Sequence, residues 1–193
     1  MNLANKLTIL RILLVPVFLL FIAIRLPYGL GIGIATLVFI IAALTDKLDG
    51  YIARSRNQIT NFGKFMDPLA DKLLVTAALV SLVEFHIILN SVATIIIARE
   101  FAVSGLRTIA ASEGIILAAS NWGKVKTVTQ IIAIIFALLN LNYKQIESVV
   151  HITNLNNYLT IITNFTMTIA VIITIISGVD YFVNNKKIFV TDK

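Results

Sequence analysis

Long apolar segments separated by short polar breaks make up most of the chain. They predict six membrane-spanning helices with approximate bounds 8–26, 29–54, 62–84, 87–110, 121–140 and 158–183. Each segment is long enough to cross a hydrocarbon core about 30 Å thick. Turn-forming residues separate the first two helices at 26–29, and a polar link at 55–61 joins the second to the third. Residues 142–157 are predicted to form one long polar loop.

The basic residues are divided unevenly between the two ends of the predicted helices. An even number of spans places both termini on one side, and all but two of the 16 Lys and Arg lie there. The two exceptions are Arg25 and Lys144. Because basic residues gather on the cytoplasmic side of a membrane, we expect both termini and the 55–61 link to face the cytoplasm. The net charge of +6 therefore reflects membrane topology and needs no nucleic acid as a partner.

Composition supports a multi-pass protein of the cell membrane. Hydrophobic residues make up 58% of the 193 positions and charged residues 13%, whereas soluble domains carry about 25% charged residues. A soluble domain of this size could not bury so much apolar surface. The absence of cysteine excludes a disulfide framework, a thiolate zinc site and a cysteine nucleophile. We expect an all-α integral membrane protein that forms a single domain over residues 1–193.

Four aspartates within 26 residues are the main candidates for chemistry: Asp46, Asp49, Asp67 and Asp71. The first two are three residues apart and the last two are four apart, so each pair shares a helix face. The pairs lie at matching distances from the 55–61 link, about 10 Å inside the predicted helix ends. Four carboxylates so close together would repel one another unless a cation held them. Oxygen ligands favour Mg²⁺ or Mn²⁺, and two ions would suit four carboxylates.

Small residues and an arginine accompany these acids. Gly50 follows Asp49, Gly63 precedes Asp67 by four residues, and Ala53 and Arg54 end the first segment. Glycine lets other groups approach the backbone closely, and arginine binds phosphate well. The combination predicts a cytoplasm-facing polar cavity for a phosphate-bearing substrate. Single intramembrane acids often serve helix packing instead, but that explanation is weak for four acids at these spacings.

The segment from Asp46 to Asp71 matches the pattern D-x-x-D-G-x-x-A-R-x8-G-x3-D-x3-D at every fixed position. It resembles the signature of the CDP-alcohol phosphatidyltransferases, and the six predicted spans agree with that family over the whole chain. Four flanking segments resemble the bacterial branch that uses sn-glycerol 3-phosphate as acceptor. They begin at Asn5, Arg99, Ser104 and Gly123.

The resemblance implies metal-dependent transfer of a phosphatidyl group from CDP-diacylglycerol to sn-glycerol 3-phosphate, with release of CMP. Asp46, Asp49, Asp67 and Asp71 would be metal ligands, and Asp71 would also be the base for the acceptor hydroxyl. A homodimer is expected. The candidates for binding CDP-diacylglycerol are Asn5, Thr8, Asp49, Gly50, Ala53, Arg54 and Gly63.

Four basic residues are candidates for binding the acceptor phosphate: Arg99, Arg107, Lys124 and Lys126. A dianionic acceptor needs cations, and Arg107 and Lys126 are the preferred pair. The cytoplasmic bias of basic residues would also place them at these helix ends without a binding role. We expect the neighbouring Glu100 to pair with an arginine.

Two alternatives remain open at this stage. The same family signature could serve another acceptor, namely inositol phosphate, serine or phosphatidylglycerol. From a different class, the carboxylates could line an ion path in a cation transporter or channel. Residues 32–44 and 73–83 are almost wholly apolar, which favours a pocket closed at its outer end over a continuous path.

Overall fold

The computed structural model describes residues 3–24, 26–55, 61–112, 117, 120–150 and 155–186. Over these residues the chain forms six α-helices and one 3-10 turn. The helices are α1 (Leu3–Ala23), α2 (Leu30–Ser55), α3 (Asn61–Glu84), α4 (Asn90–Ser112), α5 (Asn121–Val150) and α6 (Leu155–Asn184), and the turn η1 (Pro27–Gly29) joins α1 to α2. No strand occurs in the described part of the chain, so the all-helical prediction is confirmed.

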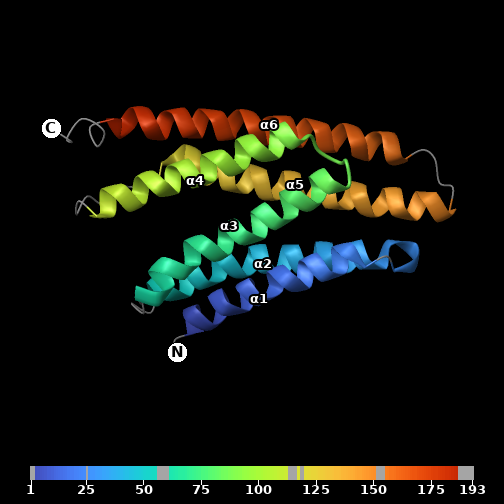
Figure 1. The fold of residues 1–193 in the computed structure, drawn as a ribbon, viewed down its shortest axis with the longest axis horizontal. Coiled ribbons are helices and arrows are strands. Elements are labelled where there is room, and N and C mark those ends of the chain that lie inside the picture. Colours follow the sequence, from blue (N-terminus) through green and yellow to red (C-terminus); the bar gives the residue numbers. More distant parts are fainter. Residues whose placement is uncertain are drawn as a thin grey trace.

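Successive helices run in alternating directions, so the start of α1 and the end of α6 lie at the same end of the molecule (Figure 1). The end of α2 and the start of α3 lie at this end, and so do the end of α4 and the start of α5. The turn η1 and the start of α6 lie toward the opposite end. This is the arrangement that alternating spans produce, and it gathers most of the basic residues at one end of the bundle.

The helices pack as two groups of three. In the first group α1, α2 and α3 contact one another, and in the second both α4 and α5 pack on α6. Contacts of α3 with α4, and of α5 with α2 and α3, join the groups. The buried core includes Phe18 and Phe39, whose ring centroids are 6.2 Å apart. Buried alanines such as Ala78 and Ala137 allow close helix packing.

Three helices contain segments long and apolar enough to span a membrane. These segments are Lys6–Ala23, Asn121–Glu147 and Asn157–Asn184, and a shorter apolar stretch covers Leu30–Thr45. In each of the three long segments fewer than half of the residues are buried inside the bundle, as expected for helices that face lipid. Within the described residues α3 and α4 contain no such segment. Their apolar runs are interrupted by charged residues, including Asp71 and Arg99.

Two glycines make the connection between α1 and α2 tight. Gly29 has a φ of +69°, a backbone conformation that glycine adopts without steric cost. A Cβ atom on Gly31 would lie 2.5 Å from the carbonyl oxygen of Ile24 and 2.7 Å from that of Phe21. Backbone atoms cannot easily move aside. Glycine at this position therefore allows the start of α2 to lie directly against the end of α1.

The predicted polar loop at 142–157 is wrong over most of its length. Residues 142–150 continue α5, and α6 begins at Leu155. Tertiary packing explains the difference, because α5 contacts η1 here. A Cβ atom on Gly29 would lie 2.7 Å from Asn142 Oδ1 and 3.3 Å from Ile146 Cγ1. This extension of α5 is stabilised by its fit against the turn, although its sequence is polar.

Candidate active site

The four aspartates lie on α2 and α3, near the helix ends that precede and follow residues 56–60. Asp46 and Asp49 are nine and six residues before the end of α2, and Asp67 and Asp71 are six and ten residues after the start of α3. At about 1.5 Å per residue, all four backbone positions are roughly 9–15 Å from those ends. The side chains of the first three lie outside the described residues, so their convergence on a metal stays a prediction.

Asp71 is the member of this set whose side chain is described. It is half-buried on α3, and its charge interacts with those of Lys72 on the same helix and Lys126 on α5. The charge of Lys72 also interacts with that of Arg107 on α4. Asp71 therefore stands where the acid-bearing helices face the helices that carry the basic residues.

The residues predicted to bind CDP-diacylglycerol lie on α1, α2 and α3. Thr8 is fully buried, and so is Arg11 one turn further along α1. The cytoplasmic bias of basic residues would place an arginine here, but it would not require the charged side chain to be fully buried. The remaining candidates lie in helices, but their side chains are outside the described residues: Asn5, Asp49, Gly50, Ala53, Arg54 and Gly63.

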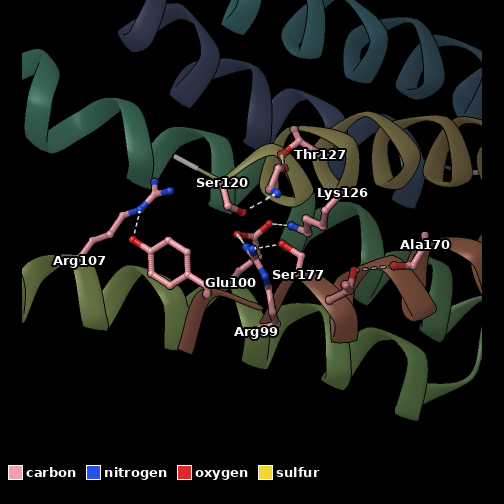
Figure 2. A network of polar contacts seen from close by, with 11 residues as sticks. Arg99, Glu100, Arg107, Ser120, Lys126, Thr127, Ala170 and Ser177 are labelled. Atoms are coloured by element: carbon pink, nitrogen blue, oxygen red, sulfur yellow. Dashed lines mark hydrogen bonds and ion pairs between the residues drawn. The ribbon is translucent and has the colours of Figure 1, made fainter. Parts of the chain in front are cut away.

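A polar layer crosses the second helix group where α4, α5 and α6 meet (Figure 2). Lys126 of α5 is 1% exposed, and its ammonium group donates to the Glu100 carboxylate of α4. Arg99 Nη1 is 3.8 Å from the second oxygen of the same carboxylate. Arg99 Nη2 donates to Ser177 Oγ of α6 at 2.6 Å. Two of the predicted acceptor-binding residues, Arg99 and Lys126, are thus brought together by one carboxylate.

Arg107 belongs to a second contact between α4 and α6. Its Nε donates to Tyr181 Oη at 3.0 Å, and its guanidinium carbon lies 5.4 Å from the centre of the Tyr181 ring. The tyrosine is buried whereas the arginine is exposed. The tyrosine therefore provides a fixed support for a cation that still reaches solvent. Lys124, the fourth predicted residue, is exposed on the first turn of α5.

The start of α5 lies beside Arg99. Ser120 caps this helix, because its Oγ accepts a hydrogen bond from the Gly123 amide at 3.1 Å. A Cβ atom on Gly123 would lie 4.0 Å from Arg99 Nη2. The positive end of the helix dipole therefore adds to the charge of Arg99 and Lys126. This part of the structure favours an anion.

Sequence reasoning missed part of this arrangement. Glu100 was expected to pair with an arginine, and its contact with Arg99 confirms that prediction. Its closer partner, Lys126, is 26 residues away on another helix. Ser177 had no distinguishing signal, because serine and threonine are common in this chain. The burial of Lys126, which requires a partner for its charge, becomes visible only in the structure.

Comparison with known proteins places this geometry in context. Residues 1–176 match the CDP-alcohol phosphatidyltransferase family. A CDP-diacylglycerol–glycerol-3-phosphate 3-phosphatidyltransferase of Bacillus subtilis (strain 168) is 41% identical to the chain over 195 aligned residues, with 95% of both chains covered. Proteins of the same name from Rickettsia felis and Haemophilus influenzae are 38% and 41% identical. Those alignments cover 97% and 93% of this chain, and 97% and 91% of the relatives.

Proposed function

Because the chain belongs to the CDP-alcohol phosphatidyltransferase family, we propose that it transfers the phosphatidyl group of CDP-diacylglycerol to sn-glycerol 3-phosphate. The products are phosphatidylglycerophosphate and CMP, and the reaction serves phosphatidylglycerol synthesis. The observation that carries this proposal is the shared name of relatives that are 38% to 41% identical over nearly the full chain.

The enzyme is a single domain over residues 1–193 that crosses the cell membrane six times. Three long apolar segments and one shorter one support spanning by α1, α2, α5 and α6. The helices α3 and α4 have spanning lengths of 24 and 23 residues, and their charged residues belong to a polar cavity inside the bundle. The end of the bundle that holds both termini faces the cytoplasm, because most basic residues gather there.

Two divalent cations, Mg²⁺ or Mn²⁺, would be held by Asp46, Asp49, Asp67 and Asp71. The donor set fits such ions, since it offers only carboxylate oxygens, and the helix registers put both pairs at similar depth. Among the described side chains, which include one of the four aspartates, no group of three metal-ligating residues occurs. When bound, the ions would neutralise charge on the pyrophosphate of the lipid substrate.

In the reaction, the 1-hydroxyl oxygen of glycerol 3-phosphate attacks the phosphorus that bears diacylglycerol. A new P–O bond forms, the bond from that phosphorus to the CMP oxygen breaks, and CMP leaves with the bonding electrons. Asp71 accepts the hydroxyl proton. Its position on α3, where its charge interacts with that of Lys126 on α5, supports this role, because a base must lie within reach of the acceptor hydroxyl.

The acceptor phosphate binds to the basic residues of α4 and α5. Arg99 and Lys126 form the inner contact beside the start of α5, and Arg107 and Lys124 lie nearer solvent. On the donor side, the lipid nucleotide is held by residues of the first helix group: Asn5, Thr8, Asp49, Gly50, Ala53, Arg54 and Gly63. Positioning of two oriented substrates supplies much of the rate enhancement in such reactions.

The expectation that the protein forms a homodimer rests on the family resemblance alone. The small residues Gly29, Gly31 and Gly33 could suit a contact between two copies of the chain, but they pack against the end of α1 and against α5 of the same chain. Chemical cross-linking in native membranes would test the dimer.

The deciding experiment is CMP release by the purified protein in detergent. CDP-diacylglycerol is supplied with Mg²⁺ or Mn²⁺, and glycerol 3-phosphate, serine, inositol phosphate and phosphatidylglycerol are offered separately. Release that needs both the metal and glycerol 3-phosphate is the expected result, and chelation by EDTA should abolish it. Release with a different acceptor would keep the family and overturn the acceptor. Cation flux in liposomes without any CMP release would favour a transporter instead.

A further inference from the structure

We propose that Glu100 is a positioning residue for the acceptor: it holds Lys126 and Arg99 in the orientation that binds the phosphate of glycerol 3-phosphate. The inference rests on the proposed function and concerns a residue that never touches the reacting atoms. An acidic side chain inside an anion-binding site is unexpected, because it repels the ligand. Its contacts in the polar layer explain why it is there.

Glu100 joins the two inner cations across two helices (Figure 2). One carboxylate oxygen accepts from the Lys126 ammonium group, and the other lies 3.8 Å from Arg99 Nη1. Lys126 is almost completely buried, so without this partner it would lose the carboxylate that is bonded directly to its ammonium group. The carboxylate thus provides the direct countercharge for a lysine at this depth.

The pairing leaves donors available for a ligand. An ammonium group has three N–H donors, and Glu100 uses one donor of Lys126. Arg99 has five donors, and Ser177 accepts from its Nη2. Arg99 Nε is buried and has no hydrogen-bond partner within the described part of the chain. A buried donor without a partner is costly, and an oxygen-rich ligand in this layer would satisfy it.

A second feature ties Arg99 to α6. Ser177 accepts a hydrogen bond from Nη2 of Arg99, while Gly178 next to it leaves room for the aliphatic part of the arginine side chain. A Cβ atom on Gly178 would lie 3.3 Å from Arg99 Cγ. Arg99 is therefore held from both sides, by Glu100 within α4 and by Ser177 on α6. Such rigid placement favours binding, because less side-chain freedom is lost when the ligand arrives.

The proposal and simple charge repulsion predict opposite changes in the KM for glycerol 3-phosphate when Glu100 loses its charge. If Glu100 acted only as a nearby negative charge, Glu100→Gln would strengthen binding of a dianionic acceptor. If Glu100 positions the cations, the same substitution weakens binding, because Lys126 loses its charged partner. The KM for glycerol 3-phosphate is then expected to rise about tenfold or more, the usual effect of losing a hydrogen bond between charged groups.

The experiment measures KM for each substrate and kcat with the intact protein in detergent. For Glu100→Gln we expect a raised KM for glycerol 3-phosphate, an unchanged KM for CDP-diacylglycerol and a kcat within about twofold of wild type. Glu100→Asp keeps the charge and should restore part of the loss. The matched control is Glu84→Gln, which removes an exposed carboxylate at the far end of α3 and should leave all three constants unchanged.

Three results would overturn the proposal: a lower KM for glycerol 3-phosphate, an unchanged one, or an equal loss in all constants while the protein stays folded. If Glu100→Gln does not fold, Ser177→Ala provides an independent test. It releases Arg99 without touching the Glu100–Lys126 pair, and it should raise the same KM. Wild-type CMP release, measured in parallel, decides the proposed function separately from the role of Glu100.

Discussion

The contact between Arg107 and Tyr181 yields a quantitative prediction for acceptor binding. Tyr181→Phe removes the hydroxyl that accepts the 3.0 Å hydrogen bond from Arg107 Nε, and it retains the ring beneath the guanidinium. Because Arg107 is exposed, water can replace the lost partner, so the cost is about 1 kcal/mol, within the usual range for one hydrogen bond. The KM for glycerol 3-phosphate should therefore rise about fivefold, with kcat nearly unchanged.

A double-mutant cycle separates this effect from a general disturbance. Arg107→Ala alone removes the cation and should raise the same KM by more than about tenfold. Adding Tyr181→Phe to Arg107→Ala should then have no further effect, since the hydroxyl has lost its partner. The control is Tyr158→Phe, which removes the hydroxyl of a tyrosine on the same helix that is 68% exposed.

Two outcomes would refute this reasoning. An unchanged KM in Arg107→Ala would show that Arg107 does not bind the acceptor. Its position would then be explained by the cytoplasmic bias of basic residues alone. Additive effects of the two substitutions would show that Tyr181 acts on the enzyme by some route other than the arginine. Steady-state CMP release at varied glycerol 3-phosphate and saturating CDP-diacylglycerol is sufficient to distinguish them.

Two further predictions concern the carboxylates and the fold. Asp71→Asn should abolish transfer while the protein keeps its wild-type melting temperature in detergent, and near-normal CMP release in this variant would contradict the role of Asp71 as base. Gly31→Ala should destabilise the protein by about 1–3 kcal/mol, since its Cβ would collide with backbone oxygens. Gly105→Ala, where nothing lies within 4 Å of the new Cβ, should leave stability unchanged or raise it, as measured by thermal unfolding.

The fold could be predicted from the sequence wherever hydropathy itself determines the helix. The predicted bounds of α2, α3 and α6 agree with the structure to within three residues, because backbone groups in lipid must be satisfied within the helix. The end of α5 could not be predicted in this way. Its polar residues remain helical because Asn142 and Ile146 fit against the turn at Gly29, a contact between distant parts of the chain.

The same distinction applies to the candidate site: features set by local helix geometry could be predicted, and features set by tertiary packing could not. The aspartates could be paired from the sequence, because helix geometry relates residues three or four apart. The contacts of Arg99 with Ser177 and of Lys126 with Glu100 could not be predicted, since these residues are 78 and 26 positions apart and the contacts depend on which face of α4 meets its neighbours. Charge counting identified the cations as a set, and packing decided which of them converge.

The placement of the four aspartates on α2 and α3, and of the candidate acceptor-binding cations on α4 and α5, suits a reaction between two anions. Two unit charges 4 Å apart repel by about 4 kcal/mol at an effective dielectric constant of 20, and both substrates here carry more than one. Under the proposed function each phosphate has its own countercharge: metal ions held by the aspartates of α2 and α3 for the lipid donor, and basic side chains on α4 and α5 for the acceptor. The reacting atoms would then meet where α3 faces α5. The charge of Asp71 interacts with that of Lys126 there, which is why we propose Asp71 as the base for the acceptor hydroxyl.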